Sequence, residues 1–359
     1  MLLLSVFGIL AASAVSSPVP DGYELETVAV LHRHGYRAPL ETYPTDPHGN
    51  ESIWSNGFGQ LTNAGKSQMH EFGKWLRNRY DGFLPAIYND RDVYAKATEI
   101  SRDMMSAAAL LSGLYEPTGT DVWNPDIKWQ PIPVHATPLS EEHTLMTVED
   151  CPKLTDLVTD LMNSDYVRGK FDKYSPTTSE ISKNAGYEDN KIVESIWLYD
   201  VFLAQSLNDL DLPDWTGAFF PDPLHEMLAF LYRIHAHDKT MQRLACGPLL
   251  KEVLSNLDET VSGNSTYKMR VYSVHDQTIV DFLRCLDVDD EETLPPFAAA
   301  VLVELYRKRD DHFVAVKYKV KDELRDLQIP KCGDLCKLAT LKESVKTVLP
   351  TDWHKECLP

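Results

Sequence analysis

The sequence predicts an α/β fold: a mixed, mainly parallel sheet covered by helices on both faces, with an inserted α-helical subdomain. Three observations lead to this prediction. A short apolar run typical of a buried strand lies at 28–31, and strand character returns at 268–274. Strand and helix patterns alternate on either side of the middle of the chain, whereas 137–245 carries helical patterns only. We therefore expect an α/β core from 18–136 and 246–359, and a helical cap subdomain over 137–245.

The first third of the chain contains two strand–helix pairs. The apolar run at 28–31 is the first strand, and a helix is predicted over 63–80 with Thr62 as its N-cap. A second strand is expected at 92–97, and it leads into a helix over about 101–115.

The middle of the chain is predicted to consist of helices joined by polar links. Apolar residues recur at three-to-four spacing in three places, at 154–162, 192–203 and 224–231. The stretch 169–186 is polar, and we expect a loop there.

Strand character returns in the last third of the chain. The strand at 268–274 is followed at once by an amphipathic helix that runs to about residue 286. Two further strands, near 298–306 and 313–320, flank a turn at 309–311 and predict an antiparallel hairpin.

Composition restricts the class of partner. The chain has 359 residues, 43% of them hydrophobic, and a formal net charge of −19. A strongly acidic protein repels nucleic acid and anionic membranes, so neither is expected as a partner. A basic loop on such an acidic body indicates a local pocket for a small anion.

The N-terminus is predicted to be a secretory signal peptide over 1–17. Residues 2–14 are apolar and uncharged, and cleavage after Ala14 or after Ser17 fits the small-residue pattern. The run is short for a membrane span, and no other stretch approaches membrane length. We expect a secreted or lumenal protein, extracellular or lysosomal, without a membrane anchor.

Export also changes how the cysteines and asparagines are interpreted. An oxidising compartment favours disulfides among the six cysteines, and Cys332 and Cys336 are close enough to form a small loop. Sequence alone leaves the connectivity open. Asn50 and Asn264 are N-glycosylation acceptors. A disfavoured alternative is a zinc site with these ligands: Cys332, Cys336, His354 and Cys357.

The stretch that carries most chemistry is Leu31–Pro39, Leu-His-Arg-His-Gly-Tyr-Arg-Ala-Pro. It places Arg33, His34 and Arg37 where a buried strand opens into a loop, and ligands of α/β proteins bind at such strand ends. Clustered cations repel one another unless an anion joins them. A solvated basic turn is the alternative, which the buried strand before the cluster disfavours.

A second polar pair, His275-Asp276, follows the strand at 268–274. If the strands that end at Leu31, Ala95 and Val274 are neighbours, the residues after them form one pocket. His275 and Asp276 then face the basic loop. Asp276 alone could instead cap the helix that follows it.

The segment Arg33–Pro39 fits the Arg-His-Gly-x-Arg-x-Pro signature, and the chain thereby resembles the histidine acid phosphatases, of the prostatic and lysosomal type. Chance would produce the five fixed positions in roughly one chain in ten thousand. The resemblance implies a secreted acid phosphatase that hydrolyses phosphate monoesters, on small molecules or phosphorylated proteins, through a phosphohistidine intermediate. It implies no metal, no cofactor and often a homodimer. It also pairs Cys151 with Cys357, which leaves Cys246 and Cys285 for each other.

The same resemblance implies the roles of the site residues. His34 is the nucleophile and Asp276 the proton donor, while Arg33, Arg37 and His275 bind the phosphate. Arginine suits this task because its planar fork binds two phosphate oxygens, and a neutral imidazole can accept a phosphoryl group. The neighbouring cations should lower the pKa of His34, and a carboxyl near its ordinary pKa suits an acidic optimum.

One position departs from the family pattern. The family carries a third phosphate-binding arginine in an Arg-x-Thr-Asp-like stretch, and the matching stretch here is Lys96-Ala97-Thr98-Glu99. Lys96 at the phosphate keeps the charge but loses the bidentate fork. It indicates a slower phosphatase, a shifted specificity, or a phosphatase-fold protein that binds an anionic ligand or a protein partner without turnover. Arg102 reaching back into the site is a weaker alternative.

His235 and His237 are spaced like a pair of metal ligands. They come at the end of a predicted helix, however, and we expect them on a solvated face rather than at a metal.

Overall fold

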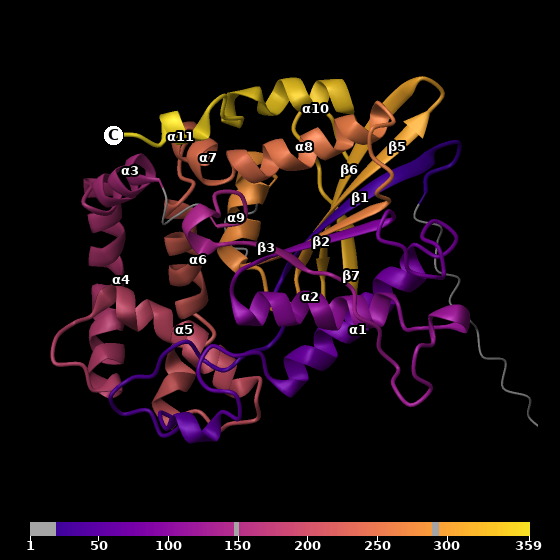
Figure 1. The fold of residues 1–359 in the computed structure, drawn as a ribbon. Coiled ribbons are helices and arrows are strands. Elements are labelled where there is room, and N and C mark those ends of the chain that lie inside the picture. The colour runs from indigo at the N-terminus through magenta and orange to yellow at the C-terminus, as the bar shows by residue number, and fades with distance from the viewer. Residues whose placement is uncertain (1–18, 147–150, 289–293) are drawn as a thin grey trace, which may run out of the picture.

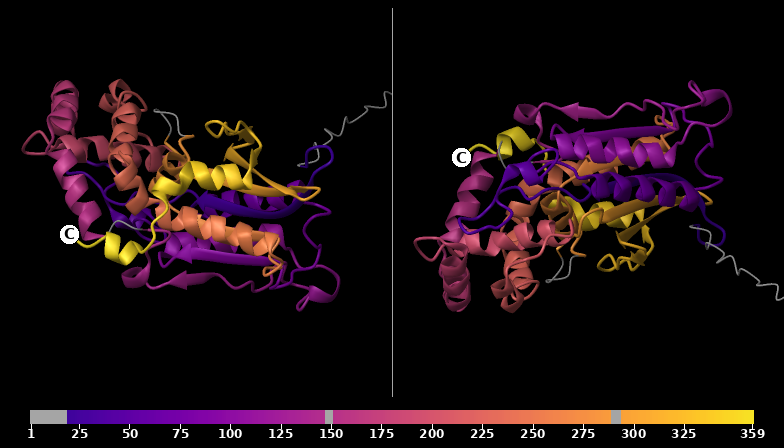
Figure 2. Two further views of the ribbon diagram at one scale, coloured as in Figure 1. Left: turned by 90° about the horizontal axis from the view of Figure 1, so that it is seen from above. Right: turned by 90° about the horizontal axis from the view of Figure 1, so that it is seen from below.

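The computed structural model describes residues 19–146, 151–288 and 294–359. It contains a sheet with helices on both faces and a group of helices beyond one end of that sheet (Figure 1). Views from above and below show the same separation between the two parts (Figure 2). This architecture confirms the predicted fold class. The predicted signal peptide, 1–17, lies outside the described residues.

The sheet has eight strands in the order β3-β2-β4-β1-β5-β6-β7, with β8 paired to β6. The strands from β3 to β1 are parallel neighbours, and β5 to β8 add antiparallel pairs at the other edge. Their bounds are β1 Glu24–Arg33, β2 Val93–Thr98, β3 His135–Thr137, β4 Met269–Val274, β5 Ala300–Lys308, β6 Asp311–Val320, β7 Glu323–Asp326 and β8 Cys336–Lys337.

Strand β1 lies at the centre of the sheet, between β4 and β5. Val28 and Val30 pack into the apolar cluster on one face, and Ala29 and Leu31 pack into the cluster on the other. A strand buried on both faces needs apolar residues at successive positions, which explains its continuous apolar run.

Two layers of helices cover the sheet. Helices α1 and α2 pack on one face, and α8, α9 and α10 pack on the other. Helix α1 begins as predicted, because Oγ1 of Thr62 accepts a hydrogen bond from the Gly65 amide at 3.2 Å. The helices are α1 Asn63–Arg79, α2 Ser101–Leu114, α3 Pro152–Met162, α4 Asp165–Ala185, α5 Ile192–Ser206, α6 Leu224–Ile234, α7 Lys239–Ala245, α8 Gly247–Val261, α9 Asp276–Cys285, α10 Leu338–Val345 and α11 Trp353–Glu356.

Helices α3 to α6 form a helical cap beyond one end of the sheet (Figure 1). The cap also includes a segment that follows β1. Tyr43 packs edge-on against Phe202 of α5, and the Thr45 amide donates to the Ala185 carbonyl at 3.1 Å. Two separate stretches of chain therefore build the cap. The predicted boundaries at residues 137 and 245 stay a prediction.

The prediction of a loop over 169–186 is wrong, because helix α4 spans it. Ser164 caps the helix, and Gly186 ends it in the left-handed conformation with φ 82°. Pro176 and a run of serines and threonines interrupt the apolar periodicity, so the sequence pattern did not indicate the buried stripe of this helix. That stripe consists of Val167, Tyr174, Thr178, Ile181, Ser182 and Ala185.

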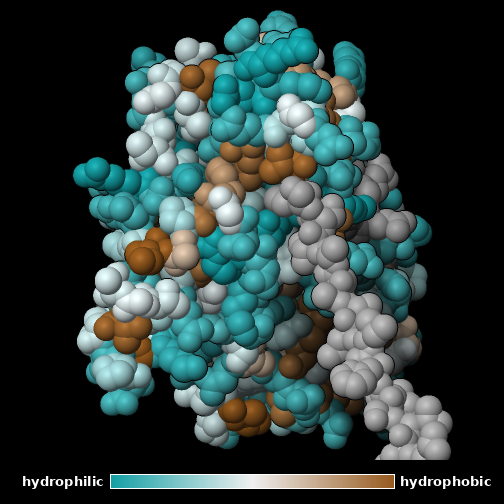
Figure 3. All heavy atoms as spheres, turned by 90° about the vertical axis from the view of Figure 1, so that its right-hand side faces the viewer, coloured by the Kyte–Doolittle hydropathy of each residue, from teal (hydrophilic) through white to brown (hydrophobic). Residues whose placement is uncertain are grey.

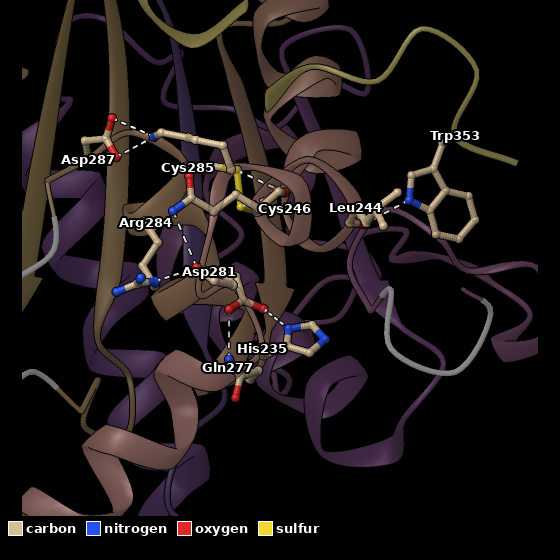
Figure 4. The surroundings of a disulfide bond; sticks show 12 residues. His235, Leu244, Cys246, Gln277, Asp281, Arg284, Cys285, Asp287 and Trp353 are labelled. Atoms are coloured by element: carbon tan, nitrogen blue, oxygen red, sulfur yellow. Dashed lines mark hydrogen bonds and ion pairs between the residues drawn. A yellow bond between two sulfur atoms is a disulfide. The ribbon is translucent and has the colours of Figure 1, made fainter. Parts of the chain in front are cut away.

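Three disulfides join the six cysteines, in the pairs Cys151–Cys357, Cys246–Cys285 and Cys332–Cys336. The alternative of a zinc site is therefore wrong, because its cysteines are bonded to other cysteines. The bond from α3 fixes the C-terminal segment, where Trp353 donates its indole N–H to the Leu244 carbonyl at 2.9 Å (Figure 4).

The end of the molecule opposite the cap exposes mostly hydrophilic residues, with hydrophobic side chains in small separate groups (Figure 3). Among the described residues, no helix combines the length and the apolar character needed to span a bilayer.

Candidate active site

The ends of three parallel strands bring the predicted residues together. Strand β4 lies between β1 and β2, and the register places Arg33 opposite Val274 and Ala97 opposite Ser273. The His34 amide continues this pairing by donating to the Val274 carbonyl at 3.2 Å. The residues that follow the strands therefore emerge at one edge of the sheet, as the sequence predicted.

Most of these residues line a cavity of about 290 Å³ between the sheet edge and the cap, whereas Arg33 lines a second pocket that shares Asp276 and Tyr232 with it. Its polar wall includes His34, Arg37, Arg102, His275 and Asp276. Its apolar wall includes Leu40, Leu145, Met146, Trp197 and Leu249. A charged end beside an apolar chamber suits a ligand with an anionic group on an organic body.

Gly35 is required because helix α1 approaches the loop closely. A Cβ at Gly35 would lie 2.5 Å from the carbonyl oxygen of Gly65, and a Cβ at Gly65 would lie 2.0 Å from that of Tyr36. The backbone of the loop thus rests directly on the first turn of α1. This contact fixes the position of His34.

His34 is buried, and its hydrogen bond determines which ring nitrogen is reactive. Nδ1 lies 3.0 Å from the Gly35 carbonyl oxygen, which can only accept, so Nδ1 carries the proton. Nε2 then holds a lone pair. Burial, followed by the charges of Arg33 and Arg37, lowers the pKa of His34 well below its ordinary value. The ring therefore stays neutral in acid.

Arg33 and Arg37 are held by carboxylates. Arg37 makes a bidentate pair with Asp200 of α5, at 2.8 and 3.0 Å, and Arg33 lies 2.7 Å from Asp276. The guanidinium of Arg33 also stacks on Phe297, 4.0 Å from the ring centroid. These partners fix the direction of both guanidinium groups before any ligand arrives.

Asp276 begins helix α9, and its Oδ1 accepts the Gln277 amide at 2.9 Å. Burial raises the pKa of this carboxyl, but Arg33, Arg37 and His275 outweigh burial and leave the pKa below its ordinary value. Without a ligand, Asp276 is therefore a carboxylate in mild acid.

His275 contacts Asp103, a carboxylate that is completely buried. Nε2 of His275 lies 3.1 Å from Asp103, and Nδ1 lies 3.5 Å from the guanidinium of Arg102. Asp103 also accepts the Thr98 hydroxyl at 2.6 Å. Burial lowers the pKa of His275, and it raises the pKa of Asp103. This arrangement directs Nδ1 of His275 toward the arginines.

The expectation that Lys96 binds the phosphate is corrected by its position. Lys96 is not among the residues that line the cavity, and its ammonium lies 3.8 Å from Glu142 and 3.6 Å from Glu252. Alternate residues of a strand point to opposite faces, and Lys96 points toward these two acids. Arg102, from the first turn of α2, lines the cavity instead. The geometry therefore favours Arg102, the weaker alternative in the sequence analysis, over Lys96 at the phosphate.

One group of residues in the described part of the chain could hold a metal ion. His34, Asp103 and His275 each offer a ligand atom, and these atoms lie within 4.8 Å of one another. The guanidinium groups of Arg37 and Arg102 line the same cavity. Three donors with a single carboxylate, among fixed positive charges, favour an anion over a divalent cation.

Sequence reasoning missed Asp200 and Asp103. Asp200 lies far from the motif along the chain, inside an apolar helical stripe, and a buried aspartate on such a face is a detectable signal. Asp103 follows Arg102 and had the same kind of signal, because it lies on the packed face of α2.

Comparison with known proteins agrees with this geometry. The sequence model of the histidine phosphatase superfamily, branch 2, matches residues 24–320. Prostatic acid phosphatase of Rattus norvegicus is 36% identical over 344 residues, which cover 93% of this chain and 89% of the relative. Lysosomal acid phosphatase of Xenopus laevis is 32% identical over an alignment of 365 residues, which covers 99% of this chain and 83% of the relative.

Solved structures show the same fold at low identity. Phytase of Hafnia alvei in complex with tartrate superposes with a TM-score of 0.69 at 16% identity, over 95% of this chain and 100% of the phytase. The multiple inositol polyphosphate phosphatase of Bifidobacterium longum gives a TM-score of 0.60 at 12% identity, over 95% of this chain and 96% of the phosphatase. The strand-end signature, the cavity that it forms and these relatives together lead to one conclusion: the chain belongs to the histidine phosphatase superfamily, branch 2.

Proposed function

We propose that this protein is an acid phosphatase that hydrolyses phosphate monoesters through a phosphohistidine on His34. The observation that carries the proposal is the contact between Nδ1 of His34 and the Gly35 carbonyl oxygen, because it assigns the proton to Nδ1 and leaves Nε2 with a lone pair. Guanidinium groups line the same cavity as His34. Phosphoryl transfer needs a positioned nucleophile and positive charge around the phosphate oxygens, and the residues here offer both.

In the first step, Nε2 of His34 forms a bond to phosphorus while the bond from phosphorus to the leaving oxygen breaks. Arg33, Arg37 and Arg102 bind the equatorial oxygens. Burial lowers the pKa of His275 in the free enzyme, but the charge of the bound phosphate raises it, so Nδ1 gains a proton and donates a further hydrogen bond. Asp276 transfers a proton to the leaving oxygen, so an alcohol departs rather than an alkoxide.

The charge of the substrate explains why Asp276 is protonated in the complex. In the free enzyme the guanidinium groups hold the pKa of Asp276 low. A phosphate dianion places negative charge beside Asp276 and competes with it for Arg33. Both effects raise the pKa of Asp276 in the complex, and mild acid then protonates it. An acidic optimum follows.

In the second step, water attacks phosphorus and the bond to Nε2 of His34 breaks. The Asp276 carboxylate takes the proton of the attacking water. Inorganic phosphate is released, and both side chains return to their starting states.

The alternative of a binding protein without turnover depended on Lys96 in the phosphate site. Because Lys96 lies beside Glu142 and Glu252, that reason no longer applies, and we propose an active enzyme.

The test is hydrolysis of phenyl phosphate near pH 5 by the wild type and by matched variants. His34→Ala should abolish turnover, and Arg102→Met should lower kcat/KM on the order of 10²-fold, because one oriented donor is lost in the transition state. Lys96→Met should keep wild-type kcat/KM. Turnover that persists in His34→Ala would refute the nucleophile, and a larger loss in Lys96→Met than in Arg102→Met would reverse the assignment of the arginine.

The cellular setting belongs to the same proposal. A signal peptide over 1–17, disulfides and N-glycans on Asn50 and Asn264 fit a secreted or lumenal enzyme, and both asparagines are exposed. Prostatic and lysosomal relatives support that location. We further propose small phosphomonoesters or phosphorylated proteins as substrates, and a homodimer, which sedimentation of the purified protein tests.

A further inference from the structure

A second polar cluster lines the same cavity, and the proposed reaction does not use it. His235, at the end of α6, lies beside Asp281 and Gln277 of α9 (Figure 4). Nδ1 of His235 is 2.6 Å from Asp281 Oδ2, and the Gln277 amide donates to Asp281 Oδ1 at 2.8 Å. His235 is therefore not on the solvated face that the sequence indicated, whereas His237 is exposed.

The other nitrogen of this ring is buried without a partner. Within the described part of the chain, Nε2 of His235 has no hydrogen-bond partner, although the side chain is only 11% exposed. Buried polar atoms are nearly always paired, so an unpaired nitrogen on a side chain that lines a cavity is a candidate to bind a polar atom from that cavity.

The partner of Nδ1 determines what this nitrogen offers. Asp281 accepts from Nδ1, so the proton there is fixed. Burial lowers the pKa of His235, but Asp281 outweighs burial and raises the pKa above its ordinary value. In acid, Nε2 therefore carries an N–H group and is a charge-assisted donor.

The two aspartates that line this cavity are already engaged. Asp281 is occupied by His235 and Gln277, and Asp276 is paired with Arg33. The wall around the cluster is apolar, and it includes Leu145, Ala245, Cys246 and Leu249. An imidazolium donor in such a wall selects an anionic oxygen, because a charged donor binds a charged acceptor best and no water competes as it does at an open surface.

We propose that His235, oriented by Asp281, forms a second anion-binding subsite, which selects phosphate monoesters whose alcohol portion carries a carboxylate or a second phosphate. The inference rests on the proposed function, because it assumes that the first phosphate binds at His34. The apolar wall contacts the body of the substrate between its two anionic groups.

Two kinds of measurement test this subsite independently of turnover. Calorimetry near pH 5 compares the Kd of phenylphosphonate with the Kd values of 3-carboxyphenylphosphonate and 4-carboxyphenylphosphonate, none of which can be hydrolysed at phosphorus. Kinetics compares kcat/KM for phenyl phosphate with the values for the two carboxyphenyl phosphates. A carboxamide analogue of each separates the charge from the added volume.

The wild type should prefer at least one carboxylate isomer over its carboxamide by about tenfold, which is the scale of a hydrogen bond between charged groups. His235→Asn and His235→Gln should abolish this preference. The matched control is His237→Asn, two residues further along and exposed, which should keep it.

The outcomes separate the two proposals. Preferential binding of the carboxyphenylphosphonates that needs His235, without hydrolysis of any phosphate, would support the subsite and overturn the proposed function. Hydrolysis of phenyl phosphate without any preference for the carboxylates would overturn the subsite alone. A preference that His235→Asn and His235→Gln both retain, in variants whose thermal unfolding shows that they fold, would also overturn it.

Discussion

His34 shows how one hydrogen bond assigns a chemical role to a side chain. The Gly35 carbonyl can only accept, so it fixes the proton on Nδ1 and leaves the lone pair on Nε2. The sequence predicted the identity of this residue from its motif. The motif did not reveal Asp103 or Asp200, because a motif records neighbours along the chain and these carboxylates reach the site through folding. Their only signal was an aspartate on the packed face of a helix.

Asp103 is expected to act as a positioning residue for His275. Asp103→Asn removes the negative charge next to Nε2 of His275, so binding of the phosphate no longer protonates His275 as readily. We expect kcat/KM for phenyl phosphate at pH 5 to fall by roughly tenfold or more, mainly through KM. Asp156→Asn, on the exposed side of α3, is the control. A lower unfolding temperature with unchanged kinetics would instead assign Asp103 a structural role only.

His32 should make stability depend on pH. Burial lowers the pKa of His32 from 6.5 to about 4. The unfolded chain therefore takes up a proton between pH 6.5 and 4 that the folded chain does not, and the free energy of unfolding falls as the pH falls through this window. The loss is on the order of 3 kcal/mol. Urea unfolding at pH 7 and pH 4 should show that His32→Leu lacks this part of the decrease, and an equal decrease in both proteins would contradict the assignment.

At the scale of elements, the strands of the core and the helical character of the cap could be predicted, whereas the order of the strands in the sheet could not. Local sequence patterns indicated β1, β2 and β4, and only the register of the folded sheet shows that their ends lie side by side. Helix α4 was missed because Pro176 and small polar residues interrupt its periodicity. Its stability comes from packing against the cap, which a local pattern does not record.

The disulfide Cys246–Cys285 connects the start of α8 to the end of α9 (Figure 4). Helix α9 carries Asp276 at its first residue and Asp281 further along, so the bond anchors the element that supplies both. Replacing both cysteines with alanine should lower the free energy of unfolding by about 2–4 kcal/mol. Urea unfolding measures this, with and without reductant. Equal stability of the wild type and the double variant under oxidising conditions would contradict it.

At the scale of the whole molecule, the protein is strongly acidic, although its candidate active site contains several arginines. The formal net charge is −19, and residues 1–17 contain no charged side chain, so removal of the predicted signal peptide leaves it unchanged. Self-repulsion of this size destabilises the compact state. Inside the site, Arg33 and Arg37 are paired with the buried carboxylates Asp276 and Asp200.

Salt should therefore stabilise the protein at neutral pH. Screening of the repulsion raises the unfolding temperature by a few degrees between low and moderate NaCl at pH 7. The effect should shrink near pH 5, because protonation of surface carboxylates reduces the net charge. Differential scanning fluorimetry across both variables measures it, and a salt effect of the same size at both pH values would show that repulsion is not the cause.

The composite origin of the cap has a practical consequence for protein engineering. A chimaera that exchanges only the stretch between α3 and α7 for that of a relative would leave Tyr43 against a foreign partner, and Arg37 would lose Asp200. A productive graft has to transfer the segment after β1 together with the helices. The wall of the cavity is built from both pieces of chain, with Leu40 from one and Trp197 from the other, so the two must be moved together.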